Sequence, residues 1–171
     1  MLYFGYGSNM LTARLRDRVP SATPHSTGWV DGYDLRFHKR SEDGSGKCNI
    51  VPVEDSVVHG VVFEVAPHEV DALDEAERRG RGYARQNVRV RGRSSSVEAF
   101  GYVAQPAYVD DALLPYEWYR ALVLAGAQEH GLPGSYVAAL RTVRSYPDPN
   151  GARRRQYRAL LDDAGYPLLS P

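Results

Sequence analysis

The sequence predicts a single α+β domain in which short mixed or antiparallel strands curl into a small barrel flanked by helices. Three observations lead to this fold class. The chain has 171 residues, 43% of them hydrophobic and 25% charged, which suits one soluble domain. Short runs of β-branched and aromatic residues, separated by turn residues, fill much of its N-terminal part. Longer stretches of helical character, ended by glycine or proline, follow in its C-terminal part.

Several short segments are expected to form strands. They are Met1–Phe4, Trp29–Tyr33, Leu35–Phe37, Cys48–Val53, Val57–Val65, Gln86–Arg91 and Val97–Val103. The Val57–Val65 segment is almost continuously apolar, so we expect it to be buried on both faces. The last two segments flank the turn residues Gly92–Ser95 and are expected to pair as a hairpin.

Helices are expected between and after these strands. They are Met10–Arg18, Pro67–Arg79, Tyr116–His130, Ser135–Val143 and Ala152–Asp163. Proline is favoured in the first turn of a helix, as at Pro67, and Gly131 with Pro133 ends the longest one. The sequence shows no internal repeat or linker. We therefore expect one domain over residues 1–171, with residues 152–171 as a C-terminal helical tail.

Charge and cysteine content argue against several classes of protein. Lys+Arg and Asp+Glu are both 21, so the formal net charge is zero, whereas nucleic-acid and membrane-surface proteins favour a basic excess. We expect no nucleic-acid or membrane partner. Cys48 is the single cysteine, which excludes an internal disulfide and suits a small strand residue. No apolar stretch is long enough for a membrane helix and no secretory signal is evident, so a cytoplasmic location is expected.

The turn after the first strand carries the first functional signal. Gly5, Gly7, Ser8 and Asn9 lie between a strand and a helix, where several backbone N–H groups are free to bind a carboxylate, a phosphate or a developing oxyanion. Phosphate fits least, because the turn has no lysine and no third glycine at the spacing of a nucleotide fingerprint. A purely structural turn remains the alternative. Either Ser8 or Asn9 is expected to cap the following helix.

Glu77 carries the second signal. At helical spacing it lies on the same face as Val70 and Leu73, so it extends an apolar stripe toward the core. Burial and the C-terminal end of the helix both disfavour its negative charge, and a carboxylate of this kind suits general acid–base chemistry. The alternative is that Glu77 pairs with Arg81 or Arg85 at the surface, outside any active site.

Other candidate residues are less specific. Tyr102 in a strand and Tyr119 on a helix face are either core aromatics or pocket residues. The five histidines do not converge, and His68-Glu69 has no second histidine at helical spacing, so no metal site is expected. The arginines between Arg78 and Arg93 form either an anion-binding stripe or a solvated face, and their alternating strand positions favour the solvated face.

Four stretches together resemble the γ-glutamylcyclotransferase family. They are Tyr6–Asn9 with Arg14 five residues further on, Leu73–Glu77, the strand of Tyr102, and Tyr119 followed by Gly126–Pro133. The resemblance covers roughly Leu2 to Leu140. It implies a small-molecule γ-glutamyl substrate whose own α-amine attacks the γ-carbonyl, releasing 5-oxoproline and a free amine. It implies no metal and no cofactor, and it allows a homodimer.

The resemblance also assigns roles to residues. Glu77 is the last residue of the Leu-Asp-Glu-x-Glu segment, the position at which the family has its catalytic glutamate. The residues expected to bind the substrate are Tyr3, Phe4, Gly5, Tyr6, Gly7, Ser8, Tyr102 and Tyr119.

The chain departs from the family pattern directly after Glu77. The family usually has glycine there, whereas this chain has Arg78, reaches its first glycine at Gly80, and has Tyr83 about one residue early. The shape of the pocket on this side therefore does not follow from the resemblance. Two alternatives stay open: the same reaction with another leaving group, such as an amine or a protected metabolite, and a non-catalytic relative that binds a small metabolite or a protein.

Overall fold

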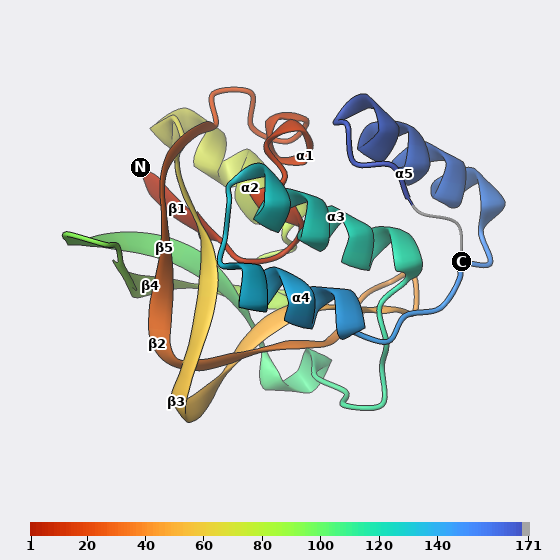
Figure 1. The fold of residues 1–171 in the computed structure, drawn as a ribbon, viewed down its shortest axis with the longest axis horizontal. Coiled ribbons are helices and arrows are strands. Elements are labelled where there is room, and N and C mark those ends of the chain that lie inside the picture. The colour runs from red at the N-terminus through yellow and green to blue at the C-terminus, as the bar shows by residue number, and fades with distance from the viewer. Residues whose placement is uncertain (169–171) are drawn as a thin grey trace.

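Five strands close into a barrel, and helices cover one side of it (Figure 1). The computed structural model describes residues 1–168. Around the barrel the strands follow the order β1-β3-β2-β4-β5. They are β1 (Leu2–Gly5), β2 (Thr23–Arg40), β3 (Gly46–Glu64), β4 (Tyr83–Arg91) and β5 (Ser96–Ala104). The expected α+β barrel is thus confirmed.

The two long strands differ from the short pieces that the sequence suggested. Trp29–Tyr33 and Leu35–Phe37 are parts of β2, which pairs antiparallel with β3 along most of its length. The pairing shifts register between Asp31 and Tyr33, and Gly32 between them has φ 74°. On β3, Asp55 has φ 60° in the stretch that faces this shift. The turn residues therefore form a bulge within the pair instead of ending the strands.

The other strand predictions are confirmed. β4 and β5 form an antiparallel hairpin from Tyr83↔Ala104 to Arg91↔Ser96. Within β3, Val61, Val62 and Phe63 are fully buried, as expected for a strand covered on both faces, but the expectation is wrong for Val57 at the start of the predicted segment, which is 43% exposed.

Two junctions close the barrel. β1 meets β5 in parallel at Tyr3↔Phe100, and β2 meets β4 at Trp29↔Arg91. Within the described part of the chain, each junction has one register pair. The β2–β3 and β4–β5 hairpins, by contrast, are paired along most of their length. The β1–β5 junction is called the seam below.

The helices are shorter at the start of the chain than expected. They are η1 (Ser8–Met10), α1 (Thr12–Arg16), η2 (Pro67–Glu69), α2 (Val70–Ala76), η3 (Pro106–Tyr108), α3 (Glu117–Glu129), α4 (Gly134–Thr142) and α5 (Gly151–Asp163). The predicted Met10–Arg18 helix is divided at Leu11, and the predicted Pro67–Arg79 helix begins with a 3₁₀ turn and ends before Glu77. The last three predicted helices are confirmed to within about one residue, which is the ordinary uncertainty of a helix end.

The expected cap at Ser8 or Asn9 is wrong. Gly7 precedes η1 and Leu11 precedes α1, and neither helix has a side-chain cap. The Ser8 hydroxyl instead accepts a hydrogen bond from Arg14 Nε, 3.0 Å away. Asn9 directs its amide away from the helix, toward the cleft described below.

Helix α3 fixes the loop that follows β1. It packs against η1, α4 and α5 (Figure 1). A Cβ at Gly126 would lie 2.4 Å from Leu11 N and 2.5 Å from Met10 C, so only glycine allows the helix to approach this backbone. Met10, Leu11 and Leu122 are fully buried in the contact. The loop is therefore held between the barrel and α3.

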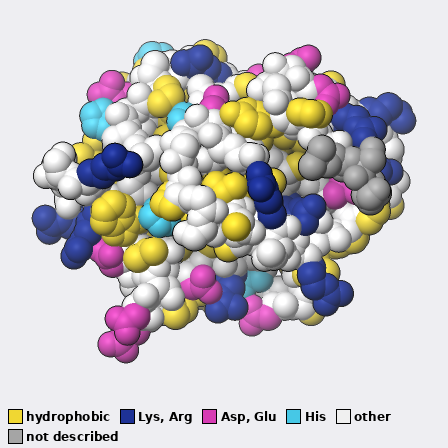
Figure 2. All heavy atoms as spheres, in the orientation of Figure 1, with side chains coloured by type: hydrophobic (Ala, Val, Ile, Leu, Met, Phe, Trp, Pro, Cys, Tyr) yellow, Lys and Arg dark blue, Asp and Glu magenta, His cyan; other side chains and the backbone are white. Residues whose placement is uncertain are grey.

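The C-terminal tail forms a helix as predicted over Gly151–Asp163, while residues 169–171 of that tail lie outside the described residues. Basic and acidic side chains are interspersed over the face shown in Figure 2. Within residues 1–168, no helix combines the length and the hydropathy needed to span a membrane.

Candidate active site

A small cleft opens where β1, the end of α2 and the hairpin β4–β5 meet. Its lining comes from six separate segments of the chain, and five of the ten residues are tyrosines. The lining residues are Tyr3, Tyr6, Gly7, Ser8, Asn9, Cys48, Glu77, Tyr83, Tyr102 and Tyr119.

Most of the residues that the sequence singled out come together in this cleft. Glu77, Tyr102, Tyr119 and the loop from Tyr6 to Ser8 all line it, together with Tyr3. Phe4 and Gly5 do not belong to the lining. The Phe4 ring is 1% exposed and packs over Gly60, on which a Cβ would lie 2.6 Å from the ring. The substrate-binding role of Phe4 and Gly5 stays a prediction.

Glu77 holds its carboxylate at the rim of the cleft, with the side chain 16% exposed. Its Oε1 accepts hydrogen bonds from Asn9 Nδ2, at 2.9 Å, and from Arg18 Nη1. Within residues 1–168, Oε2 has no hydrogen-bond partner. One oxygen is thus fixed by the protein and the other is left for a ligand. The pairing with Arg81 or Arg85 that the sequence allowed is wrong, because the partner of Glu77 is Arg18.

The chain turns sharply after Glu77. Glu77 is the C-cap of α2, which is anchored by the buried Val70 and Leu73. Arg78 then has φ 53° and Gly80 has φ 82°. The first angle is one that glycine adopts freely and that costs another residue about 1–3 kcal/mol. Arg78 therefore takes a conformation that favours glycine, in the turn that directly follows Glu77.

The loop after β1 forms a further part of the cleft lining and supplies backbone N–H groups. Within the described residues, the backbone N–H groups of Gly7, Ser8 and Asn9 have no acceptor. Gly7 lets the loop approach closely, because a Cβ there would lie 3.0 Å from Cys48 Cβ and 3.3 Å from the Tyr119 oxygen. Such a row of amides can bind a carboxylate or an oxyanion.

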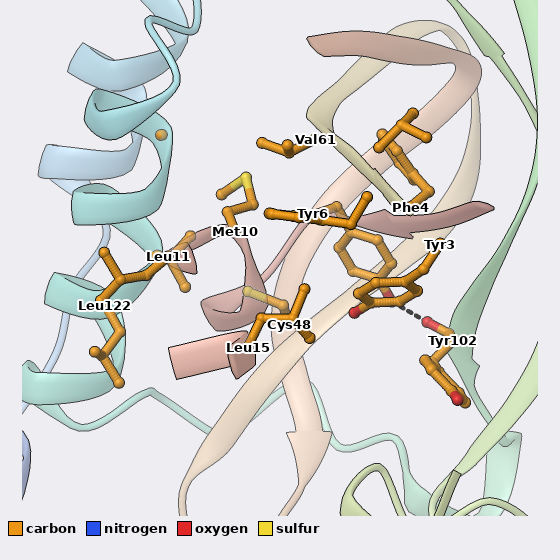
Figure 3. Close-up of a cluster of buried hydrophobic side chains, with 14 of the residues drawn as sticks. Tyr3, Phe4, Tyr6, Met10, Leu11, Leu15, Cys48, Val61, Tyr102 and Leu122 are labelled. Carbon is orange, nitrogen blue, oxygen red and sulfur yellow. Dashed lines mark hydrogen bonds between the residues drawn. The ribbon is translucent and has the colours of Figure 1, made fainter. Parts of the chain in front are cut away.

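Three tyrosine hydroxyls of the cleft donate hydrogen bonds to acceptors within the protein. Tyr6 donates to the backbone carbonyl of Tyr102, as the dashed line in Figure 3 shows. Tyr83 donates to the Cys48 carbonyl at 2.6 Å. Tyr102 donates to Asp74 Oδ1 at 2.7 Å. The lone pairs of these three oxygens remain to accept hydrogen bonds.

The other two hydroxyls have the opposite polarity. Tyr3 accepts from Asn9 Nδ2 and Tyr119 accepts from the Cys48 N–H, each at 3.1 Å, so both keep a proton to donate. Burial raises the pKa of Tyr3 and of Tyr119, which keeps both as neutral phenols. The cleft thus contains hydrogen-bond donors and acceptors at distinct positions around one carboxylate.

Sequence reasoning missed four members of the site. Arg18 and the side chain of Asn9 hold Glu77, while Tyr83 and Cys48 complete the wall. Asn9 belongs to the glycine-rich loop that the sequence singles out, but the sequence suggests a helix cap, not a contact with Glu77, for its side chain. No local pattern marks Arg18, since its partner comes from a different part of the fold.

The chain is similar to several known proteins. The model of the AIG2-like family matches residues 57–140. Gamma-glutamylcyclotransferase of Bos taurus is 30% identical over 148 residues, covering 83% of this chain and 78% of the relative. The protein of the same name from Mus musculus is 29% identical over 168 residues, covering 95% and 84%.

A solved structure named gamma-glutamyl cyclotransferase has the same fold. It superposes with a TM-score of 0.86 at 25% sequence identity, covering 95% of this chain and 98% of the other. The cleft lies within this shared fold, and the sequence relatives span most of both chains. The chain belongs to the γ-glutamylcyclotransferase family.

Proposed function

We propose that this protein is a cyclotransferase that converts a γ-glutamyl amine or γ-glutamyl amino acid into 5-oxoproline and the free amine, with Glu77 as general base and acid. One observation carries the assignment. In the part of the chain that the structure describes, a glutamate with one oxygen fixed and the other unpartnered shares a tyrosine-lined cleft with a loop whose amides are unpaired, in a chain of this family. These are the parts that an internal acyl transfer requires.

The amides of Gly7, Ser8 and Asn9 bind the negatively charged oxygen, either of the glutamyl carboxylate or of the tetrahedral intermediate. Donors that are fixed in place before the reaction lose no free energy to reorganisation when charge develops. The flexible glutamyl chain must also fold so that its amine meets its γ-carbonyl. A small cleft with fixed polar groups favours that conformation over extended ones.

Glu77 Oε2 takes a proton from the substrate's α-ammonium group. The freed amine attacks the γ-carbonyl carbon, forming the ring C–N bond and a tetrahedral intermediate. The intermediate collapses with cleavage of the bond to the leaving amine, to which Glu77 returns the proton. The ring nitrogen then gives up its second extra proton to Glu77, which passes it to the released amine, so the amine leaves as an ammonium group. Base and acid are the same residue, and the carboxylate ends as it began. The amine half of the substrate, the cytoplasmic location and the homodimer stay predictions.

The test is release of 5-oxoproline, followed by mass spectrometry, from γ-glutamyl amino acids, dipeptides and amines. Wild type, Glu77→Gln and Glu75→Gln are compared. Glu75 lies on the exposed side of the same helix and serves as the matched control. We expect release by wild type and E75Q, and loss of at least about 10²-fold in E77Q.

Each outcome decides between alternatives. The preferred substrate identifies the leaving group. No release by folded wild type from any compound would favour a binding protein over an enzyme. Equal release by E77Q would show that another group is the base.

A further inference from the structure

Asp74 lies in α2, three residues before Glu77, and is only 7% exposed. Its two oxygens serve different partners. Oδ1 accepts the hydrogen bond of the Tyr102 hydroxyl at 2.7 Å. Oδ2 accepts from Arg79 Nη1 at 2.8 Å and lies 3.4 Å from Arg85 Nη1. The carboxylate therefore connects an ion-pair cluster outside the cleft with a tyrosine that lines it.

An ionised carboxylate only accepts hydrogen bonds, so the proton between Asp74 and Tyr102 belongs to the phenol. Tyr102 has a single hydroxyl proton, and that proton points to Asp74, which lies outside the cleft lining. Burial, together with donation to Asp74, raises the pKa of Tyr102 and keeps it a neutral phenol. The oxygen that Tyr102 presents to the cleft can then only accept.

We propose that Asp74 is a positioning residue, which holds the Tyr102 proton so that the phenol oxygen accepts a hydrogen bond from the substrate's α-ammonium group. The inference rests on the proposed function. An ammonium group has three N–H donors, of which Glu77 Oε2 takes one. Tyr102 takes a second, which fixes the nitrogen for attack on the γ-carbonyl once it loses a proton.

Asparagine at position 74 separates this role from a structural one. The asparagine side chain has the same shape but only one oxygen, and two amide protons replace the second oxygen. Hydrogen bonds to cationic groups are the stronger ones, so the oxygen stays with Arg79 and Arg85. The amide then donates to Tyr102, whose own proton turns into the cleft toward the ammonium group. The substitution reverses the polarity of Tyr102 without changing the space it fills.

The experiment measures kcat/KM for wild type, Asp74→Asn, Tyr102→Phe and the double variant, with the best γ-glutamyl substrate. We expect D74N to lose about 10- to 100-fold, the usual effect of a hydrogen bond to a charged group. In the Tyr102→Phe background we expect D74N to cause no further loss. Equal losses in both backgrounds, or full activity of D74N, would overturn the proposal.

A second measurement uses a ligand that lacks the α-amine. Glutarylalanine cannot cyclise and carries no ammonium group, so its inhibition constant is expected to be the same in wild type and D74N. A parallel loss of glutarylalanine binding would mean that the whole cleft had collapsed, which contradicts a role through the ammonium group. Arg79→Met is the matched control: it removes the ion pair at Oδ2, leaves Tyr102 bonded, and should keep activity within about threefold.

Should D74N fail to fold, Tyr102→Phe alone remains decisive. The proposal predicts a raised KM for the substrate with an unchanged inhibition constant for glutarylalanine, and full activity of Y102F would refute it. Wild-type turnover in the same assay tests the proposed function separately, so the two failures are distinguishable.

Discussion

Arg18 and Glu77 form an ion pair across 59 positions of sequence, and Glu77 lines the cleft. Arg18 Nη1 also donates to Asn9 Oδ1 at 3.0 Å, and Asn9 Nδ2 donates back to Glu77. Glu77 is therefore held at one oxygen by a cation and an amide that themselves bond each other. The arrangement fixes the direction of the carboxylate and compensates its charge.

Replacing Arg18 by methionine removes the cation and keeps much of the apolar stem. We expect kcat/KM to fall by about 10- to 100-fold, because a hydrogen bond to a charged group typically contributes about 1.5–3 kcal/mol. Steady-state kinetics of the folded variant measure the loss. Arg16→Met, at a neighbour that bonds the Ala22 carbonyl, should keep the kcat/KM of wild type. An undiminished kcat/KM in R18M would contradict the role.

Gly7→Ala tests the position of the loop. The new methyl group would lie 3.0 Å from Cys48 Cβ and 3.3 Å from the Tyr119 oxygen, so the loop must shift by a few tenths of an ångström. The amide N–H is kept, but its direction changes. We expect a folded protein with activity reduced by about 10²-fold, since small displacements of binding groups have large effects on rate. Steady-state kinetics and circular dichroism check this, and undiminished kcat/KM would show that the loop amides do not act.

Gly126→Ala tests how α3 holds that loop. Its Cβ would lie 2.4 Å from Leu11 N, and backbone atoms cannot yield as a flexible side chain can. We expect the free energy of unfolding to drop by about 1–3 kcal/mol or more, as for other overpacked cores. Urea denaturation measures it. Gly134→Ala, in the first turn of α4 with nothing within 4 Å of the new carbon, should be neutral or slightly stabilising.

Cys48 should be unreactive despite lining the cleft. Burial raises the pKa of the Cys48 thiol to about 12, and only the thiolate is a nucleophile. Alkylation by iodoacetamide should therefore be slow in the native protein from pH 7 to 10. In urea it should accelerate and follow the ordinary thiol pKa near 8.5. Fast native labelling at pH 8 would show that the thiol is ionised or exposed.

Local patterns in the sequence were sufficient for part of the fold. The β4–β5 hairpin was predictable because alternation and the Gly92–Ser95 turn lie within one short stretch. The lengths of β2 and β3 were not, because a bulge at Gly32 and a strand end have the same local composition. Distinguishing them requires the partner strand.

The candidate site was likewise predictable only in part from the sequence. Glu77 stands out by its helical spacing with Val70 and Leu73, which is a local property. The bond of Tyr102 to Asp74 and that of Arg18 to Glu77 depend on how the barrel and α1 pack, which no spacing encodes. Polar partners of this kind become visible only in three dimensions.

The seam between β1 and β5 has a consequence for how the protein loses activity. Tyr3 and Tyr102 lie on opposite sides of this junction, and both line the cleft. Within the described residues the seam and the β2–β4 junction each have one register pair, so we expect the barrel to open locally at these two junctions while the β2–β3 and β4–β5 hairpins stay intact. On heating, turnover should thus cease before the far-ultraviolet dichroism of the strands is lost. A bound ligand, by bridging the two sides, should slow amide hydrogen exchange in β1 and β5 more than in the β2–β3 hairpin.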